Sequence, residues 1–236
     1  DHLRPVHALG EDGLVEHAVD RVVEAGVALE VLHVLDRPRG EVVDDVDFVA
    51  QLHLEGQKDG FGMLFDVNYI NMGGHSTREP FGVTTDVRTD LKLTIIEGAG
   101  VWNPSGNAEG FGLIFGARVF NIAQKLDLTV PVGPIQVTNN YGTSPTLLDG
   151  MLGFRYLRSI GDRASFNLRG DYSAGGTESS MNGLIGFGYA FDDAKKYTLL
   201  AGYRYMDIQF KEKDQNAEVE SELTLDGPYV GFRFGF

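Results

Sequence analysis

From Phe48 onward, apolar and polar residues alternate in segments of strand length. A period of two places successive side chains on opposite faces of a β-strand. Such alternation occurs in nine segments, at residues 48–57, 61–72, 87–102, 110–123, 147–157, 163–174, 180–191, 196–210 and 219–236. The pattern predicts an all-β protein in which strands follow one another along the chain.

The connections between these segments alternate between short and long. The short ones are residues 57–60, 103–109, 158–162 and 192–195, and the long ones are residues 73–86, 124–146 and 211–218, with the modest connection 174–179 in the long series. Short periplasmic turns and longer extracellular loops are typical of antiparallel up-and-down transmembrane β-barrels. We therefore expect such a barrel over residues 48–236.

One face of each segment is apolar enough to meet lipid. In the second segment that face carries Phe61, Met63, Phe65, Val67 and Tyr69. Aromatic residues gather near the strand ends, because amphipathic rings favour the membrane interfaces. The predicted aromatic girdles are Phe61, Trp102, Phe111, Phe191, Tyr197 and Phe236 on the periplasmic side, and Phe48, Tyr69, Tyr172 and Tyr205 on the extracellular side.

The opposite faces carry charges of both signs among small residues, and we expect them to point into a narrow lumen. The expected lumen charge network consists of Glu55, Asp66, Glu97, Arg118, Arg155, Arg169, Asp171, Arg204 and Arg233. An unpaired charge in so enclosed a space costs several kcal/mol, so these groups should pair and largely plug the barrel. Such faces are too charged for a dry ligand cavity. An ion-conducting filter is the alternative interpretation.

Bacterial single-chain barrels have an even number of strands, so nine legible strands require a tenth. The segment 48–57 ends in a short turn and should run toward the periplasm. A strand running the other way should precede it, and it falls within residues 1–47. We therefore expect about ten strands, the first of them doubtful.

Residues 1–47 form an anomalous acidic segment built from only nine amino-acid types, without Lys, Ser, Thr, Asn, Ile or aromatic residues. All nine types have codons that begin with G or C, which is what a GC-rich gene read out of frame produces. We hypothesise a frameshift or a misassigned start. The alternative is a genuine acidic extension with a helix across Leu14–Leu35. The chain begins at Asp1 with neither Met nor signal sequence, which suggests a fragment or a mature form.

Composition narrows the class of function further. The chain has no cysteine, which excludes thiol catalysis and Cys-ligated zinc. No window approaches the roughly 20 apolar residues of a membrane-spanning helix. A net charge of −14 argues against a nucleic-acid partner. We expect neither a cofactor nor a metal site.

The last strand resembles the C-terminal strand of bacterial outer-membrane barrels. Val230, Phe232, Phe234 and Phe236 share one face of it. In outer-membrane barrels the final Phe belongs to the signal that the insertion machinery reads. The order and spacing of the motifs resemble a family of small, mostly uncharacterised outer-membrane barrels of Gram-negative bacteria; these motifs are 44–48, 53–56, 61–69, 116–118, 168–171, 202–205 and 227–229. The resemblance implies an outer-membrane location, with outer-membrane lipid and the insertion machinery as partners.

Candidate chemistry is sparse in the barrel part of the chain. His75 lies in a predicted extracellular loop, where a neighbouring Ser or Glu could assist it. We expect a non-enzymatic envelope protein, either a structural or adhesion-type barrel or a small-solute pore. An outer-membrane hydrolase, protease or lipid-modifying, that uses loop residues near His75 is the alternative.

Overall fold

The computed structural model describes residues 22–30, 33–35, 45–78, 85–132, 135–214 and 217–235. The regular structure of these residues is one antiparallel β-sheet. No helix within the described ranges is long and apolar enough to cross a membrane. Phe236 and most of residues 1–47 lie outside the description.

The strands of the described residues succeed one another along the chain. Their bounds are β1 Val22–Glu30, β2 His33–Leu35, β3 Asp45–Lys58, β4 Phe61–Arg78, β5 Thr85–Trp102, β6 Gly110–Val132, β7 Ile135–Thr143, β8 Thr146–Ile160, β9 Ala164–Gly175, β10 Ser179–Ala190, β11 Tyr197–Asp214 and β12 Ala217–Gly235. All nine segments expected from the alternation are strands.

The sheet closes on itself. Each strand pairs with the next in the order β1-β3-β4-β5-β6-β8-β9-β10-β11-β12, and β12 pairs with β1. The short strand β2 extends β1 along β12 in one register, because Glu30 lies opposite Tyr229 and His33 opposite Asp226. In the same way β7 extends β8 along β6. The twelve described strands therefore fill ten positions of an up-and-down barrel, as predicted.

The first strand lies where the parity argument placed it. β1 pairs with β3 from Val22–Gln57 to Ala28–Gln51, and with β12 from Glu24–Gly235 to Glu30–Tyr229. The alternative of a helix across Leu14–Leu35 is therefore wrong for Val22–Glu30. Pairing with the open edges of β3 and β12 supplies hydrogen bonds that outweigh the modest helix preference of Val, Ala, Leu and Glu. β3 begins at Asp45, three residues before the segment expected from residue 48.

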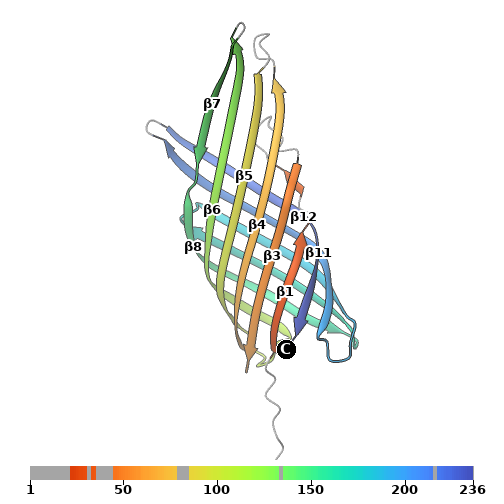
Figure 1. The fold of residues 1–236 in the computed structure, drawn as a ribbon. Helices are drawn as coiled ribbons and strands as arrows, with labels where there is room; N and C mark the ends of the chain where they lie inside the picture. Colours follow the sequence, from red (N-terminus) through yellow and green to blue (C-terminus); the bar gives the residue numbers. More distant parts are fainter. Residues whose placement is uncertain are drawn as a thin grey trace, which may run out of the picture.

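The long connections are shorter than the sequence suggested, because most of their residues continue the strands. The ladders reach Arg78–Thr85 between β4 and β5, Val132–Ile135 between β6 and β7, and Asp214–Ala217 between β11 and β12. Their alternation is less visible because polar residues replace the apolar outward ones. We call this end of the barrel the hairpin end, and Figure 1 shows β4, β5, β6 and β7 rising together there.

The other end, which we call the short-turn end, is made of tight connections. Asp59 and Gly60 both have positive φ angles, 52° and 77°, as the favoured hairpin turns require. A Cβ atom on Gly60 would lie 2.8 Å from the carbonyl oxygen of Asn103, so only glycine fits there. This turn fixes the register of β3 on β4, and with it the inward face of both strands.

Candidate functional site: two layers across the lumen

The inward faces of neighbouring strands bring opposite charges to one height. Asp66 of β4 lies opposite Glu97 of β5, which in turn lies opposite Arg118 of β6. All three are buried. With His53 of β3 and Arg169 and Asp171 of β9, they form what we call the charged layer.

Arg118 is fully buried at the centre of the charged layer. Its Nη2 atom lies 2.7 Å from Glu97 Oε2 and 2.5 Å from Asp171 Oδ1, and its Nε atom donates to Glu97 Oε2 at 3.1 Å. One guanidinium therefore joins two carboxylates on strands that are not neighbours. Such charge-assisted bonds are the strong ones in a space without bulk water.

Arg169 ties the same carboxylates from the opposite side. Its Nε atom lies 2.8 Å from Asp171 Oδ2, its Nη1 atom 3.4 Å from Asp66 Oδ2, and its Nη2 atom pairs with Glu97. Glu97 and Asp171 thus each contact two guanidinium groups. The planar, permanently charged fork of arginine suits this sharing better than a lysine would.

His53 links the charged layer to a second group nearer the short-turn end. Its Nδ1 atom lies 2.5 Å from Asp66 Oδ1, and its Nε2 atom lies 3.4 Å from Glu55 Oε2. Glu55 in turn accepts from Arg155 Nη1 at 2.5 Å. Arg155 also donates to Gln57 at 2.9 Å, so the group continues into neutral side chains.

The remaining two predicted arginines use mainly neutral partners in the described contacts. Arg204 donates to Asn68 Oδ1 at 2.8 Å and to Asn182 Oδ1 at 3.1 Å, while Asn182 donates to Asp171 at 2.8 Å. Arg233 donates to Thr198 Oγ1 at 3.3 Å. The described contacts therefore join eight of the nine predicted residues into one connected group.

The connected group is balanced in charge. Its carboxylates are Glu55, Asp66, Glu97 and Asp171, and its guanidinium groups are those of Arg118, Arg155, Arg169 and Arg204. Within the described residues, four negative and four positive charges sum to zero before His53 is counted. Balanced, hydrogen-bonded charges are the form in which buried ions are tolerated.

A further buried carboxylate on β8, that of Asp149, was not among the expected lumen charges. Asp149 accepts hydrogen bonds from Ser173 Oγ at 2.9 Å, Thr177 N at 2.9 Å and Thr177 Oγ1 at 2.5 Å. Its partners in these contacts are neutral donors on and beyond β9. Its place opposite Arg118 in the β6–β8 register is the signal that could have identified it as inward-facing.

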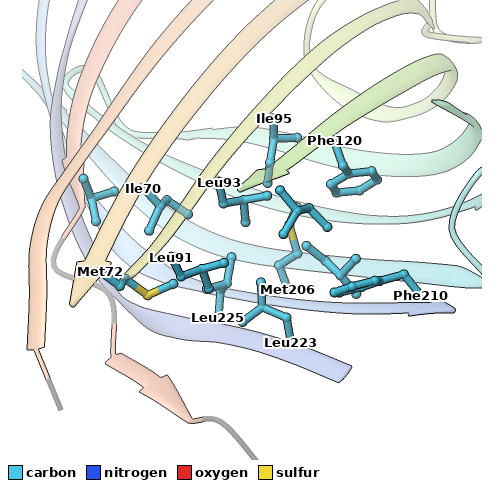
Figure 2. Close-up of a cluster of buried hydrophobic side chains, with 13 residues drawn as sticks. Ile70, Met72, Leu91, Leu93, Ile95, Phe120, Met206, Phe210, Leu223 and Leu225 are labelled. Carbon is cyan, nitrogen blue, oxygen red and sulfur yellow. The ribbon is translucent and has the colours of Figure 1, made fainter. Parts of the chain in front are cut away.

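Between the charged layer and the hairpin end, the inward faces become apolar. Val49, Ile70, Met72, Leu91, Leu93, Ile95, Phe120, Ile122, Met206, Ile208, Phe210, Leu223 and Leu225 form one buried cluster, which we call the apolar plug. Figure 2 shows side chains of β4, β5 and β6 meeting those of β11 and β12 across the lumen. The expected lumen charge network therefore occupies only part of the inner face, and the apolar plug of the other part was not predicted.

The cause of the plug is visible in the alternation. Asp66 and Asn68 in β4 are followed on the same face by Ile70 and Met72, and Phe120 and Ile122 follow Arg118 in β6. Each large apolar side chain buried this way contributes roughly 1.5–3 kcal/mol. The two walls therefore pack against each other as in a soluble β-sandwich.

A cavity lies on the short-turn side of the charged layer. It measures about 150 Å³, and its lining includes Leu64, Ile114, Leu184, Leu200 and Arg233. Among the described residues, no cluster of three or more His, Asp or Glu side chains is arranged to hold a metal ion. Leu64 and Ile114 also belong to a second buried apolar cluster, with Ala99, Val101 and Met151, so apolar side chains pack on this side of the charged layer too.

The outward surface carries the predicted aromatic residues. Phe61, Trp102, Phe111, Tyr172, Tyr197 and Tyr205 are exposed, Tyr69 is half-exposed, and Phe236 lies outside the described residues. Phe61 stacks on Trp102 with ring centroids 6.5 Å apart near the short-turn end, and Phe48 lies 6.2 Å from Tyr69 farther up the barrel. Met63 is 77% exposed between these two pairs.

His75 is placed on the outside of the β4–β5 hairpin. Its Nε2 atom lies 3.9 Å from Asp86 Oδ1, beyond hydrogen-bond distance, and both side chains are more than half exposed. Arg88 lies opposite His75 in the register. This surface pair lacks the enclosed geometry in which an orienting acid fixes a catalytic imidazole.

Comparison with solved structures finds outer-membrane proteins. The chain is similar to Neisserial surface protein A, with 14% identity, 92% of this chain and 97% of that chain covered, and a TM-score of 0.35. It is similar to the translocator domain of the autotransporter NalP from Neisseria meningitidis (12% identity, 92% and 86% covered, TM-score 0.45). It is also similar to the attachment invasion locus protein Ail of Yersinia pestis (11% identity, 91% and 97% covered, TM-score 0.36). No family model matches the chain, and no curated protein matches it.

Proposed function

We propose that the chain is a closed barrel of the bacterial outer membrane that displays its hairpins at the cell surface and does not conduct solutes. On this proposal the short-turn end faces the periplasm and the hairpin end faces outward, as in outer-membrane barrels generally. The proposal rests on two different groups of side chains that close the same lumen one after the other. The charged layer spans it first, and the apolar plug fills it beyond.

The two closures exclude solutes for different reasons. A hydrated ion meeting the apolar plug would lose its water without gaining a polar partner. The charged layer is held by bonds of 2.7 Å and 2.5 Å that join β6 to β5 and to β9. Opening it would leave buried charges without partners.

The outward surface supports the membrane location. Phe61, Phe65 and Phe111 are exposed on the outward face, where a soluble β-barrel carries mainly polar residues. A continuous exposed apolar surface of this kind marks a contact with lipid or another apolar partner. Its aromatic pairs lie at two levels, as membrane interfaces favour.

Planar-bilayer conductance of the refolded full chain tests the proposal. We expect no current steps from the wild-type protein. We also expect none from Phe120→Ala/Phe210→Ala, which thins the apolar plug, or from Glu97→Ser/Arg118→Ser, which thins the charged layer. The quadruple variant, with both layers thinned, should conduct.

The matched control is Ile96→Ala/Phe115→Ala, which truncates outward side chains on β5 and β6, the strands of Glu97 and Arg118, and should not conduct. Heat-dependent gel mobility establishes that each variant is a folded barrel. Steps from the wild-type protein would contradict the proposal. Steps from either double variant alone would contradict the idea of two independent closures.

A further inference from the structure

The cavity on the short-turn side of the charged layer has a wall of two kinds. The apolar part comes from five different strands and consists of Leu64, Ile114, Leu157, Leu184 and Leu200. The polar part includes Arg155 and Arg169. The sequence predicts inward faces that are too charged for a dry ligand cavity, but here five apolar side chains gather around one space.

The size and the wall of this cavity suit one small aromatic ring. The cavity measures about 150 Å³, and an apolar cavity of roughly this volume can hold a molecule of benzene. Water is a poorer occupant, because a buried water needs about two to four polar partners and the apolar side chains provide none. Arginine side chains favour an aromatic body over an aliphatic one, because the guanidinium plane stacks on aromatic faces.

Two buried polar atoms of the wall have no hydrogen-bond partner among the described residues. They are Oδ1 of Asn167 and Nε of Arg155. The side chain of Arg155 is only 7% exposed, and its Nη1 and Nη2 atoms already donate to Glu55 and Gln57. Asn167 Oδ1 is a neutral acceptor, and a buried acceptor without a donor is costly. A ligand that donates to Asn167 would remove this cost.

We infer that the cavity binds a small neutral phenol, whose ring packs among the apolar side chains and whose hydroxyl group donates to Asn167 Oδ1. Asn167 lies opposite Leu157, which is two residues along β8 from Arg155, so both unpaired atoms belong to the same part of the wall. A hydroxyl group supplies a donor and an acceptor, which are the two partners that these atoms require. The inference goes beyond the proposed function, since such binding does not require a closed barrel.

An anionic aromatic compound fits this wall less well. Arg155 Nη1 already lies 2.5 Å from Glu55 Oε1. Likewise, Arg169 Nε lies 2.8 Å from Asp171 Oδ2. These two positive charges are therefore already balanced by carboxylates of the chain. An ionised carboxylate is also an acceptor only, so it would leave Asn167 Oδ1 without a donor.

Saturation-transfer NMR with phenol and with benzene, on the full refolded chain in micelles of a perdeuterated detergent, tests the inference. Protein-free micelles give the background from partition into the detergent. We expect saturable binding of both compounds to the wild-type protein. Phenol should bind about tenfold more tightly than benzene, which is the factor that one hydrogen bond to a buried unpaired group provides.

Asn167→Leu keeps the size of the side chain and removes the acceptor, so it should weaken phenol binding about tenfold and leave benzene binding unchanged. Leu157→Trp fills part of the cavity and should remove the binding of both compounds. Its matched control is Leu152→Trp, on the exposed outward face of the same strand, which should bind like wild type. Heat-dependent gel mobility establishes that each variant is a folded barrel.

A wild-type protein that shows no saturable binding of phenol would overturn the inference. So would an Asn167→Leu variant in which phenol and benzene binding change alike, or binding of phenol that survives Leu157→Trp. Tighter binding of benzoate than of phenol to the wild-type protein would overturn the choice of a neutral ligand. None of these outcomes changes the conductance result, so failure of the inference and failure of the proposed closed barrel are distinguishable.

Discussion

Arg118→Met should show whether bulk water is excluded from the charged layer. The substitution keeps the length of the side chain and removes its charge, leaving Glu97 and Asp171 without the bonds of 2.7 Å and 2.5 Å that Arg118 supplies. Breaking a buried ion pair by removing one partner costs about 3–5 kcal/mol, whereas a solvated pair is worth about 0–1 kcal/mol. Because Arg169 still contacts both carboxylates, we expect a loss of unfolding free energy near the lower limit, about 3 kcal/mol.

The assay is denaturant unfolding of the refolded barrel in lipid vesicles, followed by the fluorescence of Trp102. This is the single tryptophan of the chain, and it lies exposed on the outward surface beside Phe61, so its emission shifts when it leaves the lipid. Glu97→Gln combined with Arg118→Met removes both charges of one pair and should cost at least about 1 kcal/mol less than the sum of the single variants. A loss below about 1 kcal/mol for Arg118→Met, or additive losses, would refute a dry layer.

Three further outcomes are expected. Gly116→Ala should destabilise the barrel by about 1–3 kcal/mol in the same assay, because its Cβ would overlap the carbonyl oxygen of Gly98. The matched variant Gly98→Ala meets no atom within 4 Å and should be neutral. The pKa of Asp192 lies below its usual range because its carboxylate accepts the backbone N–H groups of Tyr197 and Lys196. The stabilisation that the ionised Asp192 contributes is therefore complete above the unfolded pKa of about 3.9, and it is lost as the pH falls through the folded pKa. The denaturation midpoint of the wild-type protein should therefore fall more between pH 6 and pH 3 than that of Asp192→Asn. Sequencing of the encoding DNA should reveal, in another frame upstream of the Phe48 codon, an alternating strand and a signal peptide, and the absence of both would refute the frameshift hypothesis.

Strand alternation was enough to predict the barrel and the inward direction of its charges. The side-chain period of two fixes which face Asp66, Glu97 and Arg118 share, and the short turns fix their relative heights. The partners of each charge could not be predicted in the same way, because a position on a face does not reveal which guanidinium reaches which carboxylate across the lumen. His53 is an example, because its place on the inward face does not reveal that it links Asp66 to Glu55.

The apolar plug could not be predicted from any single strand. Ile70, Leu93 and Phe120 have the same parity as the charged residues below them, yet an isolated apolar residue on a lumen face carries little information. What makes it a core is the meeting of β4–β6 with β11 and β12, which are distant in sequence. The raised hairpins were missed for a related reason, since polar strands outside a bilayer lack the apolar face by which the spanning strands were identified.

The first strand is held in the cylinder by short ladders. β1 meets β12 only between Glu24–Gly235 and Glu30–Tyr229, while β11 meets β12 along its whole length, from Tyr197–Phe234 to Asp214–Ala217. Two strands joined by a short turn can pair starting from that turn. β1 and β12 come from opposite ends of the chain, so they pair only after the rest of the sheet has curved. The β1–β12 pairing is therefore the last strand pairing to form and the first to break. Without the first strand the rest of the sheet would still fold, but the barrel would stay open. Its two free edges, on β3 and β12, would then pair either with each other or with strands of neighbouring molecules.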